Sequence, residues 1–308
     1  MRHLLDVDDL TAEELAEILT LSRQPEPPAV LAGAGVALIF EKPSNRTRNA
    51  TEMAVVALGG HPISIRGEEI GLGVRESVAD VTRVLAGYHR VVGARVNDHR
   101  TLEEMASLDV VPVVNLLSDR SHPCQALADL LTLDEHWGGL KGRTVAWVGD
   151  GNNVARSLVH GCARAGTAVR LASPAGHQLD EQSVATAREA GGDVFVTTDP
   201  AEAVAGADAV CTDVWVSMGQ EAEGGARLAA FEGYQVDEAL MDRAAPGAVF
   251  LHCLPAHRGQ EVSAGVIDGP ASLVWRQAAN RMHAARGLFL WLAGEQMPAS
   301  AVRQTRVQ

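Results

Sequence analysis

The sequence predicts an α/β protein made of two doubly wound parallel-sheet domains, bridged by helices and with the active site in the cleft between them. Three observations support this fold class. Short β-rich apolar runs alternate with helical patterns along the chain, which is typical of parallel sheets covered on both faces. The 308 residues are enough for two ordinary cores, with 46% hydrophobic and 21% charged residues. Polar clusters follow five expected strands, and ligands of doubly wound sheets bind at such strand ends.

The first half begins with a helix. Charges run throughout the segment MRHLLDVDDLTAEELAEIL, and Thr11 with Glu14 has the spacing of a capping box, so it is not a signal peptide. Strands are then expected at GVALIF, HPISI, RVVGARV and VPVVNLL. The segment TRNATEMAVVALGG has helical apolar spacing and ends on Gly59 and Gly60.

A helix over residues 122–137 is expected to join the two halves, because Pro123 suits its first turn and glycines follow its end. A second series of strands then starts near residue 141, with TVAWVGD, AVRLASP, DVFVT, DAVCTDVW and AVFLHCLP. The last helical stretch, about Ala278 to Ala293, has no strand partner and is expected to return to the first half. The predicted domains are 1–131, with the C-terminal segment 278–308 added to it, and 132–277.

Composition narrows the function classes. The net charge of −13 comes from 26 Lys and Arg against 39 Asp and Glu, which argues against nucleic acid as a partner. No apolar run approaches membrane-spanning length, so no membrane partner is expected. The four cysteines, at positions 124, 162, 211 and 253, form no CxxC pair, which favours free thiols in a cytoplasmic enzyme over disulfides or a metal site.

The segment SNRTR, Ser44–Arg48, lies where the first strand passes into a helix. A helix start leaves backbone N–H groups unpaired and carries a partial positive charge. Arg46 and Arg48 add to that charge, so the segment predicts an anion site with phosphate as its natural ligand. The alternative is a polar helix cap with solvated arginines, for which Pro43 and Ser44 would suffice.

Four further clusters follow strands, and each alone has an ordinary explanation, such as a helix start, a tight turn or a buried cysteine. They are HPCQ (His122–Gln125), GDGNN (Gly149–Asn153), DVWVSMG (Asp213–Gly219) and HCLP (His252–Pro255). A dinucleotide site at GDGNN is disfavoured, because its third glycine position is Val154 and the next strand ends without an acid. Together, the five clusters predict one cleft between two domains.

These motifs, taken in order, resemble the aspartate/ornithine carbamoyltransferase family over essentially the whole chain. The family's Ser-Thr-Arg-Thr-Arg signature corresponds to Ser44–Arg48, and its His-Pro-x-Gln corresponds to His122–Gln125. The segments Asp213–Gly219 and His252–Pro255 match the signatures of the ornithine-specific branch. The family's ENRMH corresponds to ANRMH at Ala279–His283.

The resemblance implies transfer of the carbamoyl group from carbamoyl phosphate to the side-chain amine of L-ornithine, giving citrulline and phosphate in arginine metabolism. It implies no metal and no cofactor, and a homotrimer or a larger assembly of trimers. The residues it assigns to carbamoyl phosphate are Ser44, Asn45, Arg46, Thr47, Arg48, Arg95, His122, Pro123, Cys124, Gln125, Cys253, Leu254 and Arg281. Those it assigns to ornithine are Asn153, Asp213, Ser217 and Met218.

The implied catalytic group is Arg46, Arg95, His122, Asp213 and Cys253. In this scheme His122 donates to the carbonyl oxygen, where negative charge grows during the reaction. The ornithine amine must be neutral to attack, so the rate is expected to rise with pH.

Two positions depart from the family pattern. Asn45 stands where the family has Thr, and Gly71 or Glu69 stands where it has a Gln that reaches a neighbouring active site of the trimer. A related transcarbamylase acting on putrescine or an acylated ornithine is a second interpretation, although Asp213 disfavours an acylated and therefore uncharged α-nitrogen. A catalytically silent paralogue is a third, and the retention of His122 and Cys253 speaks against it.

Overall fold

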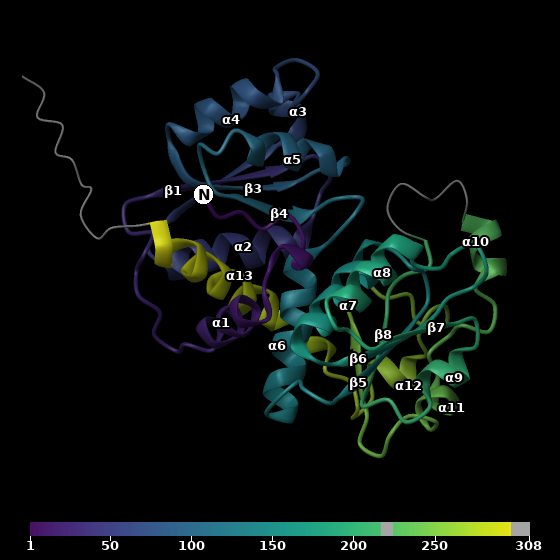
Figure 1. The fold of residues 1–308 in the computed structure, drawn as a ribbon. Helices are drawn as coiled ribbons and strands as arrows, with labels where there is room; N and C mark the ends of the chain where they lie inside the picture. Colours follow the sequence, from purple (N-terminus) through teal and green to yellow (C-terminus); the bar gives the residue numbers. More distant parts are fainter. Residues whose placement is uncertain (217–223, 297–308) are drawn as a thin grey trace, which may run out of the picture.

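A computed structural model, which describes residues 1–216 and 224–296, shows two lobes that each contain a parallel sheet (Figure 1). The first sheet has the strand order β2-β1-β3-β4 and the second β7-β6-β5-β8-β9, and every strand pair is parallel. The strands are β1 (Gly35–Phe40), β2 (His61–Arg66), β3 (His89–Arg95), β4 (Val113–Leu117), β5 (Thr144–Val148), β6 (Ala168–Ala172), β7 (Val194–Thr197), β8 (Ala209–Thr212) and β9 (Val249–His252). The predicted fold class is confirmed.

Two helices, η1 (Val7–Asp9) and α1 (Ala12–Ser22), precede the first strand. The other helices of the first lobe connect successive strands, as the alternating pattern predicts, and they are α2 (Asn45–Ala57), α3 (Gly67–Ile70), α4 (Val78–Ala86) and α5 (His99–Ser107). The capping box at α1 is present, because Thr11 Oγ1 accepts from the Glu14 backbone N–H at 3.2 Å and Glu14 Oε2 accepts from the Thr11 N–H at 2.9 Å. The sequence therefore sets this helix start locally.

Helix α6 (Pro123–Trp137) lies between the two lobes (Figure 1). Its residues from Pro123 to Leu133 are all buried, which is the pattern of a helix covered on every side. It packs against α7 (Asn153–Ala165), where Gly161 allows a close approach: a Cβ at this position would lie 2.7 Å from Leu130 Cδ1. The remaining helices of the second lobe are α8 (Glu181–Glu189), α9 (Pro200–Val204), α10 (Gly224–Ala230), α11 (Glu238–Met241) and α12 (Ala264–Ile267).

The last helix, α13 (Val274–Gln296), begins beside β9 and packs against α1, α2 and α6 of the other lobe (Figure 1). Leu288, Phe289 and Trp291 are buried in these contacts. The helix begins before the predicted stretch of 278–293, because its first turn carries the exposed Trp275, which hides the helical pattern in the sequence.

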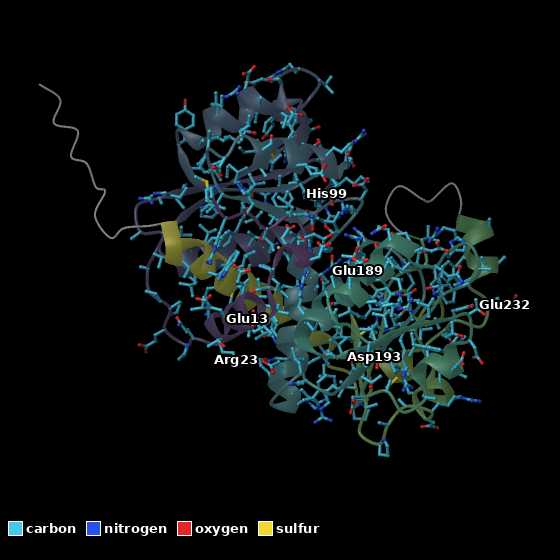
Figure 2. All side chains as sticks on the ribbon, in the orientation of Figure 1. Glu13, Arg23, His99, Glu189, Asp193 and Glu232 are labelled. Carbon is cyan, nitrogen blue, oxygen red and sulfur yellow. The ribbon has the colours of Figure 1, made fainter. Side chains whose placement is uncertain are left out.

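One large hydrophobic core joins the lobes, since Leu38 of β1, Leu131 of α6 and Val145 of β5 belong to the same cluster. Two smaller clusters cover the outer faces of the two sheets. Four exposed acidic side chains are labelled in Figure 2, namely Glu13, Glu189, Asp193 and Glu232. Among the described helices, none has the length and apolar character needed to cross a membrane.

Candidate active site

A cavity of about 960 Å³ lies at the carboxyl ends of the strands, with walls from both lobes. It brings together most of the predicted site residues, namely Ser44, Asn45, Arg46, Thr47, Arg95, His122, Gln125, Asn153, Asp213, Cys253, Leu254 and Arg281. They come from loops and helix starts that follow β1, β3, β4, β5, β8 and β9, and from α13. Strand ends at the facing edges of two parallel sheets thus share one cavity.

The SNRTR segment forms the start of α2. Ser44 occupies the N-cap position, but its side chain makes no capping hydrogen bond, and its Oγ instead accepts from Arg95 Nη1 at 3.5 Å. Arg46 lines the cavity. Arg48 is directed away from it, with 49% of its side chain exposed and its Nε donating to Glu52 at 2.8 Å. The segment therefore presents one of its two arginines to the cavity.

Three guanidinium groups, of Arg46, Arg95 and Arg281, gather at this end of the cavity. In the described part of the chain, no ion pair joins any of them to a carboxylate. Burial lowers the pKa of Arg95 to about 10, with Arg281 and Arg46 as further causes. Arg281 donates to Gln125 Oε1 and, through Nη2, to Thr47 Oγ1 at 3.0 Å. Buried cations without a paired acid make a site for an anion of more than one charge.

His122 lies beside these cations and is only 5% exposed. Burial, together with the charges of Arg281, Arg95 and Arg46, holds its pKa well below the usual 6.5. The imidazole is therefore neutral at pH 7 and has a single N–H to donate. Its backbone N–H donates to Ser157 Oγ of α7 at 2.8 Å, so a helix of the second lobe holds the histidine in place.

The two residues between His122 and Gln125 do not line the cavity. Pro123 is the first residue of α6, where a missing N–H costs nothing. Cys124 is buried on the other side of the helix, with its Sγ donating to the Asn115 carbonyl at 3.4 Å. Burial raises its pKa to about 11, so it remains a thiol.

Asp213 also lines the cavity and is 6% exposed. Its carboxylate accepts from Asn152 Nδ2 at 2.9 Å, from the Val214 N–H at 2.8 Å and from Cys253 Sγ at 2.8 Å. Burial and the neighbouring Asp213 raise the pKa of Cys253 well above 9.0, so this cysteine is a thiol donor and not a thiolate. Among the described residues, no cation pairs with Asp213.

The structure describes two of the four remaining predicted residues, Asn153 and Leu254. Asn153 lines the cavity, and its Nδ2 donates to the Ser118 carbonyl at 2.7 Å across the two lobes. Leu254 has a φ of +59°, a conformation that bulky residues rarely adopt and that is common at functional sites. Ser217 and Met218 lie outside the described residues.

Asp213, His252 and Cys253 place their ligand atoms within 4.8 Å of one another, which is a possible arrangement for a metal ion. However, both ring nitrogens of His252 already have partners. Nδ1 accepts from the Leu254 N–H at 2.8 Å, and Nε2 lies 3.2 Å from Glu261 Oε1. The histidine therefore fits a structural role better than that of a metal ligand.

Sequence reasoning missed several cavity residues, namely Lys42, Asp150, His177, Arg227 and His257. Arg227 is 7% exposed, and its guanidinium donates to Asp150 and to the Trp215 carbonyl. Asp150 could have been found, because it lies within the GDGNN cluster at the end of β5. Arg227 is carried by α10 without a local motif, so only the fold reveals it.

Comparison with known proteins gives matches over nearly the whole chain. Residues 2–135 match the carbamoyl-P binding domain and residues 141–292 the Asp/Orn binding domain of aspartate/ornithine carbamoyltransferase. The ornithine carbamoyltransferase of Rhizorhabdus wittichii is 47% identical over 94% of both chains. The anabolic ornithine carbamoyltransferase of Pyrococcus furiosus is 44% identical over 95% of this chain and 96% of its own.

Solved structures of ornithine carbamoyltransferases also match nearly the whole chain. The P. furiosus ornithine carbamoyltransferase structure matches with a TM-score of 0.91 and 44% identity, covering 96% of this chain and 97% of the other. That of Thermus thermophilus has a TM-score of 0.86 and 44% identity, covering 94% and 98%. With both domains matched in sequence and the two-lobed fold matched in space, the chain belongs to the aspartate/ornithine carbamoyltransferase family.

Proposed function

We propose that this enzyme transfers the carbamoyl group of carbamoyl phosphate to the side-chain amine of L-ornithine, giving L-citrulline and phosphate. The observation that carries the proposal is the polarity of the cavity. Three arginines line it together with the carboxylate of Asp213, and among the described residues neither the arginines nor Asp213 form an ion pair. Carbamoyl phosphate offers a dianion to the arginines, and ornithine offers an α-ammonium group to Asp213.

At the arginine end, the phosphate group binds to the start of α2. Ser44, Asn45, Arg46 and Thr47 supply side chains there, and the first N–H groups of the helix point at the same anion. Arg95 adds a second cation. Arg48 supports the segment from outside through its ion pair with Glu52.

The carbamoyl group lies next to His122 and Gln125. The neutral His122 donates to the carbonyl oxygen, while Gln125 and the carbonyls of Cys253 and Leu254 hold the amide nitrogen, with Arg281 completing the pocket. The neutral amine of ornithine attacks the carbonyl carbon, the bond to the phosphate oxygen breaks, and the leaving phosphate takes up the proton that the amine loses. Negative charge that grows on the carbonyl oxygen meets donors already in place, so positioning and charge stabilisation account for catalysis.

Ornithine binds across the cleft from the second lobe. We assign its α-ammonium to Asp213 and Ser217, and its carboxylate to Asn153 and the Met218 backbone. The buried, hydrogen-bonded Asp213 supports the first assignment, because an uncompensated carboxylate in a cavity attracts a cation. The corresponding division of the chain assigns 1–131 with 278–308 to carbamoyl phosphate and 132–277 to ornithine.

The direct test is citrulline formation with a panel of amines. L-Ornithine should be the fastest acceptor. N-Acetylornithine should be much slower because its α-nitrogen carries no charge for Asp213, and putrescine should be much slower because it lacks the carboxylate assigned to Asn153 and the Met218 backbone. The reaction should proceed in the presence of a chelator and without nicotinamide. Faster turnover with putrescine would overturn the substrate assignment and favour the related transcarbamylase.

The pH dependence offers an independent test. The attacking amine resembles that of lysine, with a pKa of about 10.4, so its neutral fraction rises about tenfold per pH unit below that value. His122 stays neutral throughout, because its pKa lies well below 6.5, and Cys253 stays a thiol. We therefore expect kcat/KM for ornithine to rise steadily between about pH 7 and pH 9. A plateau in this range would show that an enzyme group, not the amine, limits the rate.

We also propose that the protein forms a homotrimer in the cytoplasm. Exposed apolar side chains gather on or beside α2, β2 and α4 of the first lobe, namely Met53, Val56, Ile63, Val74, Val84 and Tyr88. Such a surface on an otherwise acidic protein is typical of a subunit interface. All four cysteines are free thiols, and this supports the proposed location because the cytoplasm is a reducing compartment. Light scattering that gives the mass of a single 32.5 kDa chain would contradict the trimer.

A further inference from the structure

We propose that Asp129 is a positioning residue that orients the amides of Gln125 and Gln277 and thereby aligns two walls of the carbamoyl pocket. The proposal rests on the function proposed above, since it assigns Gln125 to the carbamoyl amide. Asp129 itself lines no part of the cavity and touches no substrate.

The geometry centres on one carboxylate oxygen. Asp129 lies on α6, one turn beyond Gln125, and is 3% exposed. Its Oδ1 accepts from Gln125 Nε2 at 2.7 Å and from Gln277 Nε2 of α13 at 2.7 Å. A single oxygen therefore joins a cavity residue of α6 to the first turn of the last helix.

The orientation of Gln125 follows from its two neighbours. A carboxylate can only accept hydrogen bonds and a guanidinium can only donate them. Gln125 lies between Asp129 and Arg281, so its Nε2 must face Asp129 and its Oε1 must face Arg281. The flipped amide would place a donor against a donor and an acceptor against an acceptor. Asp129 thus keeps an acceptor oxygen turned toward the cavity, where the carbamoyl NH₂ needs one.

Gln277 is oriented by the same logic. Its Nε2 faces Asp129, and its Oε1 accepts from the backbone N–H of His252 at 2.9 Å. His252 is the last residue of β9 and directly precedes Cys253 and Leu254, which line the cavity. The carbonyls of these two residues are the ones assigned above to the other wall of the carbamoyl pocket. Asp129 therefore connects both walls through two amides that each have one possible orientation.

A purely structural role does not explain an acid at this position. In the described part of the chain Asp129 forms no ion pair, and burial raises its pKa to about 6 against the opposing effect of the two amide donors. A buried charge of this kind costs free energy that an apolar side chain would not. What the acid contributes is an acceptor that excludes the flipped amides.

The experiment compares Asp129→Leu with Asp129→Asn, measuring KM and kcat for citrulline formation and the calorimetric Kd of carbamoyl phosphate. Leucine removes the acceptor, whereas asparagine retains one through Oδ1. We expect the leucine variant to raise KM and Kd for carbamoyl phosphate about tenfold or more, with KM for ornithine changed less than about twofold. The asparagine variant should stay within about threefold of wild type.

Asp134→Leu is the matched control, because it removes an acid of the same helix that pairs, outside the cavity, with Arg23, the residue directly after α1. It should lower the melting temperature without changing KM for carbamoyl phosphate. Two results would overturn the positioning role of Asp129. One is a folded Asp129→Leu variant with a normal Kd for carbamoyl phosphate, and the other is an Asp129→Asn variant as impaired as the leucine variant. If Asp129→Leu does not fold, Gln277→Met decides: it should also raise KM for carbamoyl phosphate, and a normal KM would refute the proposal.

The wild type separates this inference from the proposed function. If the wild type forms citrulline but Asp129→Leu binds carbamoyl phosphate normally, only the positioning role is refuted. A wild type that neither binds carbamoyl phosphate nor forms citrulline refutes both.

Discussion

Replacing Arg46 with alanine should abolish most carbamoyl transfer and leave the fold intact. Arg46 lines the arginine end of the cavity at the start of α2, and no described carboxylate pairs with it, so its charge is available for the phosphate. Loss of a desolvated, charge-assisted pair costs on the order of several kcal/mol, which corresponds to a fall in kcat/KM of about a thousandfold or more. Steady-state citrulline formation with varied carbamoyl phosphate measures this fall.

The thermal stability of Arg46→Ala should not fall with its activity. Arg46 contributes to lowering the pKa of Arg95, which means that the two cations repel each other in the empty cavity. Removing Arg46 should therefore leave the melting temperature unchanged or slightly raised while activity is lost. Arg100→Ala is the matched control, since its side chain is 84% exposed, pairs with Asp98 and lies outside the cavity. Turnover by Arg46→Ala within a few fold of this control would show that the phosphate site is misassigned.

Much of the fold was predictable because its signals are local. The strand GVALIF appears as β1, and polar residues directly after strands must face the same edge of a parallel sheet. That rule was enough to expect Arg46, His122, Asp213 and Cys253 in one cleft, and the structure brings all four to one cavity.

Which side chain of a motif enters the cavity was harder to predict, because it depends on helix rotation. Successive residues of a helix differ by about 100°, so positions three apart share a face and positions two apart do not. Gln125 lines the cavity whereas Cys124 is buried elsewhere, and Arg46 lines it whereas Arg48 pairs with Glu52. The sequence motif alone does not show which of these residues line the cavity.

Contacts between distant segments left no signal in the sequence. Asp129 and Gln277 are each ordinary polar residues of a helical pattern, and only the packing of α6 against α13 makes them neighbours. Arg227 is buried over Asp150 for the same kind of reason. Long-range polar networks of this type must be read from the fold, since no spacing rule connects their members.

Asp213→Asn should impair the use of ornithine and spare the binding of carbamoyl phosphate. The substitution keeps the shape of the side chain and removes the charge proposed to pair with the α-ammonium. Asp213 is 6% exposed, so the pair would be shielded from water, and its loss should cost about 2–4 kcal/mol in kcat/KM for ornithine. Calorimetry with carbamoyl phosphate alone should change little, because the groups proposed to bind it are the arginines and not Asp213.

The matched control is Asp208→Asn, just before the opposite end of the same strand β8. Asp208 accepts from Arg143 Nη1 at 3.0 Å and from the Thr144 N–H at 2.8 Å, and it lies outside the cavity. Both variants remove one carboxylate charge from the second lobe, so a general effect on stability or net charge would appear in both. Only Asp213→Asn should raise KM for ornithine. If carbamoyl phosphate binding collapsed in Asp213→Asn while ornithine saturation stayed normal, the assignment of ornithine to Asp213 and of carbamoyl phosphate to the arginines would be refuted.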